Sequence, residues 1–269
     1  MLEQRGRLHF RGPLAAELFS REIDESWEGV LRKNYFGPLE GPLAGCVAAS
    51  VDGRPWSDTM WSRDAGVFLR ELVQWGYMEH ACLTAEALMR FVTPNEKGYR
   101  CFPERFILGE PGSGTELDGT GATVIGLVLL WERLPEGHST RDRIYQFLHE
   151  DSSPLHAIHA SLQETPLVAG SGEFGGGCGI DGLYMNTVQN GLCRLALLAG
   201  SRMEHQAGDT VLAARHHDDA RGLEQAMKRY CVGKDGCWLW CVDKDSLLPD
   251  PAIIEHPINK GFGGINGVG

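Results

Sequence analysis

One short segment of the sequence combines side chains that can bind a sugar. Trp61-Ser62-Arg63-Asp64 opens an amphipathic segment that we expect to be helical to about Gly76. A pyranose ring offers an apolar C–H face that stacks on an aromatic ring, and hydroxyls that hydrogen-bond to charged groups. Trp61, Arg63 and Asp64 therefore form a candidate substrate-binding set. The alternative is structural, with Asp64 as an ordinary helix cap beside a surface arginine.

Acidic residues recur in front of two later predicted helices. Glu116-Leu117-Asp118-Gly119 leads into one apolar helix, and Gly172-Glu173-Phe174 leads towards another. We expect Glu116 and Asp118 to divide between a capping role and a substrate-binding role, with Asp118 favoured for contact with the ligand.

Glu173 has the surroundings of a general acid. A Gly-rich loop with an aromatic neighbour desolvates a carboxyl group, which raises its pKa and keeps it protonated near neutral pH. Inverting glycoside hydrolysis needs one such acid at the leaving oxygen and one carboxylate that activates water. We therefore predict that Glu173 is catalytic. The alternative is a loop carboxylate without a partner.

Helices must position these candidate residues, and the apolar periodicity with its Gly and Pro breaks predicts helices along most of the chain. We expect an irregular aromatic loop at 97–115, one strand of a small β-hairpin at 45–51 with the hairpin turn at 52–53, and a strand at 237–242. Long loops that enter helices from one side would gather acidic groups at one end, so we predict an all-α toroid of paired helices. The predicted helices cover 13–33, 61–76, 79–92, 122–134, 141–149, 154–163, 183–203 and 213–231.

Composition and charge exclude several classes of protein. The formal net charge of −11 and the pI near 5.4 argue against nucleic acid or an anionic membrane as a partner. The chain shows no signal peptide and no apolar run of the roughly 18 residues that a membrane span needs. Its 8 cysteines lack zinc-type spacing, which indicates reduced thiols and a cytoplasmic protein. We expect neither a metal nor a cofactor.

The run His216-His217-Asp218-Asp219 contains metal-ligand side chains. At helical spacing these four residues point around nearly the whole circumference and cannot converge on one ion. We therefore predict a solvated helix face rather than a metal site.

The order of these motifs resembles that of the six-hairpin glycosidases of the glucoamylase and glycogen-debranching (amylo-α-1,6-glucosidase) type. The similarity rests on Trp61-Ser62-Arg63-Asp64, Glu116-Leu117-Asp118-Gly119 and Gly172-Glu173, followed by Tyr184-Met185-Asn186-Thr187-Val188-Gln189-Asn190, and it spans roughly 56–209. It implies an (α/α)6 barrel whose active site lies where the long loops gather. By this resemblance Arg63 and Asp64 would bind hydroxyls of the non-reducing sugar, Trp61 would stack nearby, and Glu173 would be the general acid.

Two features depart from that family. Phe174 and three glycines follow Glu173, where these enzymes commonly have a second acidic or bulky polar residue, so the substrate need not be starch. The sequence predicts about eight helices, against the six pairs of a complete barrel. We therefore expect residues 1–269 to be a single toroid domain and an N-terminal part of such an enzyme, with the catalytic base outside this chain.

Two other functions share these sequence features. A toroid sugar epimerase would rely on histidines for proton transfer at a sugar carbon, and His156 and His159 lie on one predicted helix face. We expect both to be packed or surface histidines instead. A non-catalytic carbohydrate-binding scaffold would bind sugar without turnover. The sugar, its linkage and the oligomeric state are left open by the sequence.

Overall fold

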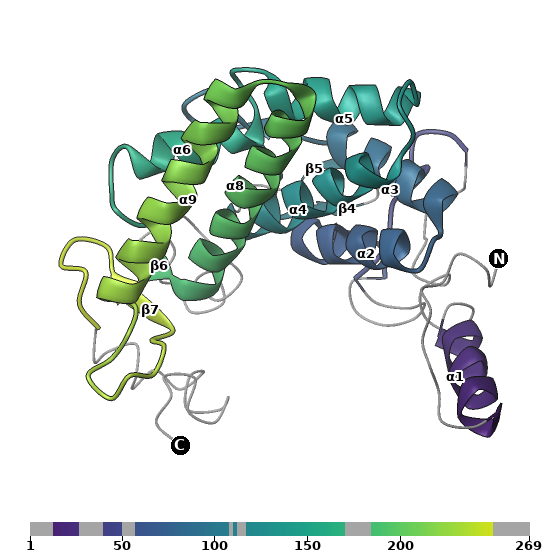
Figure 1. Ribbon diagram of the computed structural model, residues 1–269, viewed down its shortest axis with the longest axis horizontal. Coiled ribbons are helices and arrows are strands. Elements are labelled where there is room, and N and C mark those ends of the chain that lie inside the picture. Colours follow the sequence, from purple (N-terminus) through teal and green to yellow (C-terminus); the bar gives the residue numbers. More distant parts are fainter. Residues whose placement is uncertain are drawn as a thin grey trace.

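The computed structural model describes residues 13–26, 40–49, 57–107, 110–111, 117–169 and 184–249. Within these residues the chain is mostly helical, and none of the helices is long and apolar enough to cross a membrane (Figure 1). The helices are α1 (Pro13–Ser26), α2 (Ser62–Gln74), α3 (Met78–Arg90), α4 (Leu117–Arg133), α5 (Ser139–His149), α6 (Pro154–Leu162), α8 (Thr187–Ala207) and α9 (Thr210–Tyr230).

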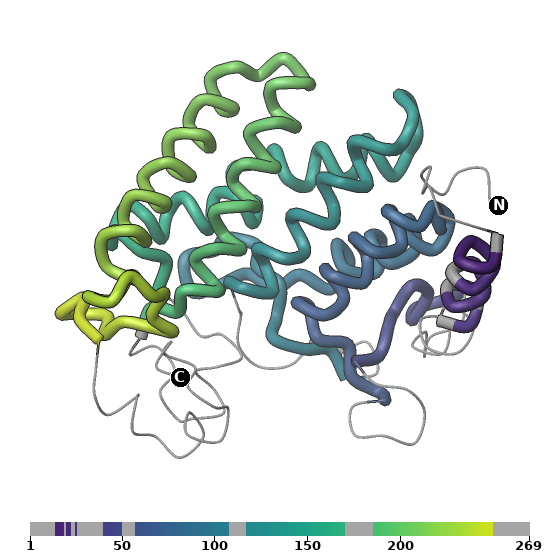
Figure 2. Tube along the Cα trace, turned by 60° about the horizontal axis from the view of Figure 1, so that its bottom comes forward, coloured from purple at the N-terminus to yellow at the C-terminus, as the bar shows by residue number. Residues whose placement is uncertain are grey.

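Helices α2, α4 and α8 pack side by side as an inner row, and α3, α5 and α9 cover them from outside (Figures 1 and 2). The inner helices run in the same direction. The start of α4 meets α8 where the Leu117 carbonyl lies 3.4 Å from the Cys193 sulfur. Near the other end, Arg202 of α8 bonds to Glu132 of α4 at 3.1 Å. All three inner helices therefore begin at one end of the molecule.

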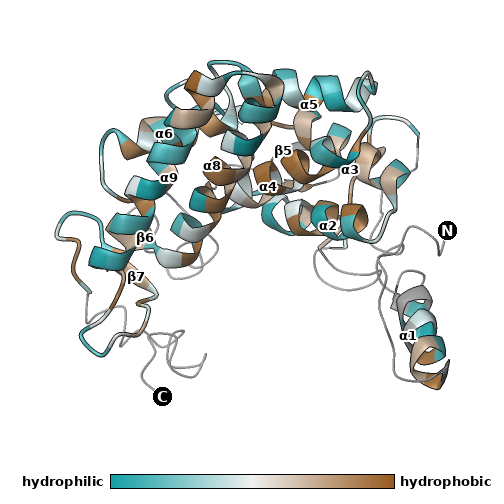
Figure 3. Cartoon of the chain, in the orientation of Figure 1, coloured by the Kyte–Doolittle hydropathy of each residue, from teal (hydrophilic) through white to brown (hydrophobic). Residues whose placement is uncertain are grey.

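The inner row is held by apolar side chains and by close backbone contact. Helix α4 is buried around nearly its whole circumference, as expected for a helix that is apolar on all sides (Figure 3). Glycines allow the approach: a Cβ on Gly66 would lie 2.6 Å from the Thr123 nitrogen, and one on Gly126 would lie 2.8 Å from the Gly66 carbonyl oxygen. At the contact between α4 and α8, a Cβ on Gly121 would lie 2.8 Å from the Leu192 carbonyl carbon.

Short strands lead the chain into two of the inner helices. Strand β1 (Thr59–Trp61) precedes α2 and pairs with β4 (Arg105–Ile107), which also pairs with β5 (Glu110–Pro111). Strand β6 (Tyr184–Asn186) precedes α8 and pairs with β7 (Cys241–Asp243). Strands β2 (Thr93–Pro94) and β3 (Arg100–Cys101) form a third small pair.

Most predicted helices are confirmed, and the differences lie at their starts and at the end of α8, which is Ala207 where the prediction had 203. The predicted helix 122–134 begins five residues earlier, at Leu117, because Gly119 and Gly121 fit close helix contacts instead of ending the helix. The first residues of the predicted helix 183–203 are strand β6, and the predicted loop 97–115 contains strands β3, β4 and β5. The predicted strand 237–242 is reduced to β7 and one isolated bridge, Val232 to Trp238. The turn predicted at 52–53 lies outside the described residues, as do 27–33 of the first predicted helix.

Candidate functional site

The start of α2 carries three of the predicted sugar-binding residues. Trp61 ends β1 and occupies the N-cap position of α2, where its side chain makes no capping hydrogen bond. Arg63 and Asp64 follow in the first helical turn. Asp64 is therefore not the N-cap residue, and its carboxylate lies where the helix dipole favours negative charge.

An ion pair joins the start of α2 to the start of α4. The Arg63 Nη1 lies 3.0 Å from the Asp118 Oδ2, and both side chains are largely buried. The other Asp118 oxygen accepts a hydrogen bond of 2.7 Å from the Gly119 backbone N–H. Two candidates 55 residues apart in the sequence are thus brought together, with Arg63 engaged by Asp118.

Small polar residues fit the two helix starts to each other. A Cβ on Gly119 would lie 2.2 Å from the Ser62 Oγ, so only glycine fits at this position without a shift. The Thr123 hydroxyl donates to the Ser62 carbonyl at 3.0 Å. The buried Ser62 Oγ has no hydrogen-bond partner among the described residues. This contact fixes how Arg63 meets Asp118.

Among the site residues that the structure describes, Asp64 has a shifted carboxyl pKa. Desolvation by surrounding protein atoms raises this pKa, the Arg63 charge lowers it, and the Asp118 charge raises it. The side chain nevertheless remains accessible to solvent at the start of α2. Asp64 can therefore reach a ligand and hold a proton at a higher pH than an ordinary aspartate.

An arginine that the sequence analysis missed lies beside the aromatic residue of the site. Arg105 of β4 is the cross-strand partner of Trp61, and its guanidinium carbon lies 5.5 Å from the Trp61 ring centroid. Such a cation over an aromatic face is favourable. The sequence signal was the aromatic segment before α4, where the predicted loop at 97–115 contains strand β4 instead.

Asparagine side chains at the start of α8 bind backbone groups of that helix and of Val168. Asn186 caps α8 by accepting from the N–H groups of Val188 and Gln189. The Asn190 amide both accepts from the Val168 N–H, at 2.7 Å, and donates to its carbonyl, at 3.2 Å. The chain is thereby tied to the start of α8 just before the segment that contains Glu173. Glu173 itself and Glu116 lie outside the described residues.

The prediction for the run at 216–219 is wrong for two of its four members. His216 is fully buried between α9 and its neighbours, and neither ring nitrogen has a hydrogen-bond partner among the described residues. Burial lowers its pKa to about 3, with a further contribution from Arg215. Asp219 pairs with His159 of α6 at 2.6 Å, whereas His217 and Asp218 are exposed. The solvated face is therefore limited to the latter two.

A shallow groove of about 420 Å³ lies away from these residues, between α3 and α5. It includes none of the predicted site residues. Its charged side chains pair with one another or with backbone, as in Arg143 with Glu86 and Arg100 with Glu150. We therefore keep the facing starts of α2 and α4 as the candidate site.

No known protein-family model matches the sequence, and no curated protein sequence matches it significantly. Two solved structures share its fold. A glycoside hydrolase of family 105 from C. acetobutylicum ATCC 824 has a TM-score of 0.54 and 13% identity, over 82% of this chain and 59% of that one. Rex8A from Paenibacillus barcinonensis, solved in complex with xylose, has a TM-score of 0.51 and 12% identity, over 91% of this chain and 61% of that one.

A cellobiose 2-epimerase from Bacillus thermoamylovorans B4167 has a TM-score of 0.40 and 11% identity, over 88% of this chain and 77% of that one, a level that supports no argument. The first two structures are (α/α)6-barrel enzymes, which confirms the predicted all-α class and the (α/α)6 toroid for this chain. The chain spans about three fifths of their length, 59% and 61%. The likeness does not single out the glucoamylase or debranching type.

Proposed function

We propose that this chain belongs to a carbohydrate-active enzyme, and specifically to a glycoside hydrolase that cleaves an oligosaccharide or α-glucan-like glycan by inverting acid/base hydrolysis. The observation that carries the proposal is the meeting of Arg63, Asp64 and Asp118 at the facing starts of α2 and α4, beside Trp61. The fold shared with a family 105 glycoside hydrolase and with xylose-bound Rex8A supports it.

The geometry gives each described residue a separate role. The buried Asp118 carboxylate holds the Arg63 guanidinium and so fixes its charge at the start of α2, beside Asp64. Asp64 is accessible and adds an acceptor on the same helix turn. Trp61 offers an aromatic surface next to both, to which a pyranose face can stack. Together these groups would orient the sugar ring at the reacting end of the toroid.

Proton transfer is assigned to Glu173, with the catalytic base outside this chain. The chain on either side of residues 170–183 is held at the start of α8, through Val168 before the segment and Asn186 after it. This anchoring supports the delivery of Glu173 to the end of the toroid at which α2 and α4 begin. Asp64, whose pKa is raised, is the second candidate for holding a proton there.

Glu173→Gln tests the acid role. The variant should lose at least about a hundredfold in cleavage of natural glycosides and largely keep cleavage of glycosyl fluorides, whose leaving group needs little protonation. Both substrate classes should be assayed in the enzyme that includes the base. If Asp64→Asn shows this split and Glu173→Gln does not, Asp64 is the acid. If both variants lose activity equally on natural glycosides and on glycosyl fluorides, neither Glu173 nor Asp64 is the proton donor.

Asp64→Asn also tests the sugar subsite. It should cut turnover at least about tenfold, because it removes a charge-assisted hydrogen bond worth roughly 1.4 kcal/mol in the transition state. Asp142→Asn is the matched control, since Asp142 is an exposed acid in the first turn of α5. Unchanged kinetics in Asp64→Asn would assign Asp64 a structural role.

The epimerase alternative would use His156 or His159 for proton transfer at a sugar carbon. The His156 ring contacts Ser153 and Arg215, and the His159 ring pairs with Asp219. Both rings are therefore engaged with neighbours on α6 and α9. Sugar binding with no turnover in the enzyme that includes the base would favour the non-catalytic scaffold instead.

A further inference from the structure

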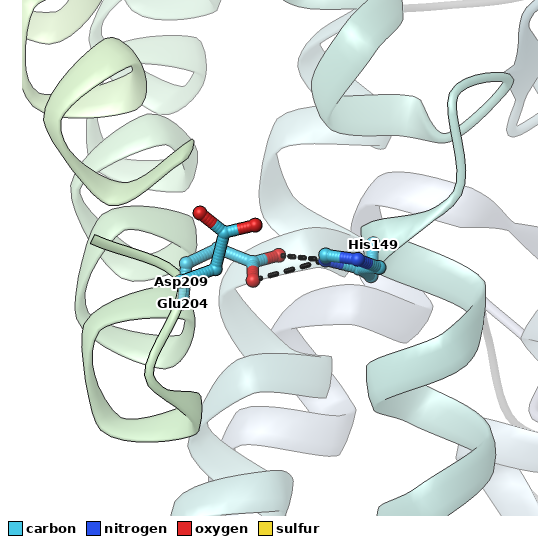
Figure 4. A group of neighbouring side chains, drawn as sticks. All are labelled: His149, Glu204 and Asp209. Atoms are coloured by element: carbon cyan, nitrogen blue, oxygen red, sulfur yellow. Dashed lines mark hydrogen bonds and ion pairs between the residues drawn. The ribbon is translucent and has the colours of Figure 1, made fainter. Parts of the chain in front are cut away.

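A second cluster of side chains lies at the other end of the inner row. His149 ends α5, Glu204 lies in the last turn of α8, and Asp209 is the N-cap residue of α9 (Figure 4). One ligand atom from each lies within 4.8 Å of the other two. Glu204 is 11 residues beyond Cys193, the α8 residue that meets the start of α4. At 1.5 Å per residue, this places the cluster about 16 Å along α8 from the candidate sugar site.

The separations in this cluster suit two ligands of one metal ion. The His149 Nδ1 lies 3.2 Å from the Glu204 Oε1 and 3.1 Å from its Oε2. Two ligand atoms at the usual Zn–N and Zn–O distances from a tetrahedral ion lie about 3.4 Å apart. A small movement of the two side chains would therefore let His149 and Glu204 bind the same ion. Asp209 has a ligand atom within 4.8 Å of both and could bind it as a third ligand.

The charges around Glu204 also favour the binding of a cation. The Glu204 side chain is fully buried, and among the described residues its only ion-pair partner is His149, with no lysine or arginine. Burial raises the pKa of Glu204 by more than His149 and the Tyr145 hydrogen bond lower it, and the Asp209 charge also raises this pKa. Both His149 and Glu204 lie at helix C-termini, where the partial negative charge of the backbone favours cations. A dication would neutralise this excess of negative charge.

The ligand groups are held in place by neighbours, and the Tyr145 hydroxyl, which also lies 3.3 Å from the His149 Nδ1, must turn away from that nitrogen when an ion binds. The Tyr145 ring stacks on the His149 ring, with centroids 5.0 Å apart, and its hydroxyl donates to the Glu204 Oε2 at 3.2 Å. The Gly208 left-handed turn fixes Glu204 relative to Asp209, whose N–H donates to the Glu204 carbonyl at 2.9 Å. Such outer contacts orient metal ligands in known sites.

We propose that His149, Glu204 and Asp209 bind a divalent transition-metal ion, of which Zn²⁺ is the example, and that the ion fastens α5 to the α8–α9 turn. One imidazole nitrogen with two carboxylates suits Zn²⁺ or a neighbouring transition metal better than Ca²⁺ or Mg²⁺, which prefer oxygen ligands only. The His149 side chain is 40% exposed, so the ion can reach the site from solvent. Water would complete the coordination.

The test is Zn²⁺ binding to the chelator-treated, reduced full chain, measured by calorimetry and by the shift of Tm with Zn²⁺ concentration. We expect one tight equivalent and a Tm that rises with the metal, because an ion that binds only the folded state stabilises it. Asp209→Asn should weaken binding at least about tenfold while keeping the helix cap, since Asn caps as well as Asp. His149→Phe should do the same while keeping the ring stacked on Tyr145.

Two controls identify the ligands. His205→Gln changes an exposed histidine next to Glu204, and Cys237→Ser removes an exposed thiol that could bind Zn²⁺ adventitiously. Both should keep the tight equivalent. Absence of binding, or binding that survives Asp209→Asn and His149→Phe but is lost in a control, would show that the cluster is a hydrogen-bonded network only.

Discussion

Replacing Gly66 by alanine tests the contact that positions the site. In a helix the change alone favours folding by about 1 kcal/mol, because glycine is a poor helix former. Here, however, the new Cβ would lie 2.6 Å from the Thr123 nitrogen and 2.7 Å from the Ala122 carbonyl carbon, both backbone atoms. An ordinary contact is about 3.5 Å. Helix α4 must therefore retreat by roughly 0.9 Å and loosen the packing of Leu69.

We expect this overpacking to cost about 3 kcal/mol, the upper end of the usual range, because no side chain can turn aside. The net loss of unfolding free energy is then about 2 kcal/mol. Gly222→Ala is the matched control: this glycine lies in α9, is exposed, and would bring its Cβ within 4 Å of nothing. It should stabilise by up to about 1 kcal/mol.

The assay is urea unfolding followed by far-UV circular dichroism, with the midpoints compared at an unchanged slope. The two variants should shift the midpoint in opposite directions. In the active enzyme, Gly66→Ala should also lower turnover, because it moves Arg63 relative to Asp118. The reasoning is refuted if Gly66→Ala is as stable as Gly222→Ala.

Three further predictions concern charged and buried groups. Arg63→Met should lower the unfolding free energy by about 3 to 5 kcal/mol, since it removes the cation that pairs with the buried Asp118. Adding Asp118→Asn to that variant should recover part of the loss in thermal unfolding, and strict additivity of the two changes would contradict the pairing. Asp64→Asn should raise Tm at pH 7, because a raised pKa means that ionisation of Asp64 opposes folding. At a pH below the ordinary Asp pKa of 3.8 the same change should leave Tm unaltered, and a lower Tm at pH 7 would contradict the reasoning. Between pH 6.5 and about 3 only the unfolded state protonates the His216 ring, so the native protein loses about 5 kcal/mol of unfolding free energy as the pH falls through this window. His216→Leu should remove this loss, and an unchanged acid profile would contradict the burial of His216.

Sequence periodicity predicted the helices but not their contacts. Helices α2 and α3 were predictable because apolar residues recur at helical spacing and a short Gly-containing turn separates them. The true start of α4 was not, because Gly119 and Gly121 normally end or weaken helices. Their small size is required only by Ser62 and Leu192, which come from distant parts of the chain. Local propensity could not contain that information.

The site was predicted as a set of residues rather than as a geometry. The sequence indicated Arg63, Asp64 and Asp118, but the Arg63 to Asp118 pairing depends on how α2 packs on α4. The burial of His216 was within reach: it shares its spacing with Ala213, Ala220 and Leu223, the buried face of α9. Its neighbours His217 and Asp218 are exposed, and they give the whole run a polar appearance that conceals this period.

The direction of the inner helices sets the backbone electrostatics at the two ends of the inner row. Asp64 and Asp118 lie in the first turns of α2 and α4, where unpaired backbone N–H groups favour negative charge. Arg63 pairs with Asp118 there and Arg105 lies beside Trp61, so this end holds both carboxylates and guanidinium groups, which are the groups that bind sugar hydroxyls. Glu204 lies at the opposite end of α8, where the backbone itself is negative, and its buried carboxylate is paired with His149 and accepts from Tyr145. Parallel packing of the inner row thus gives the two ends opposite demands, and a metal ion at the C-terminal end is the counterpart of the carboxylates at the N-terminal one.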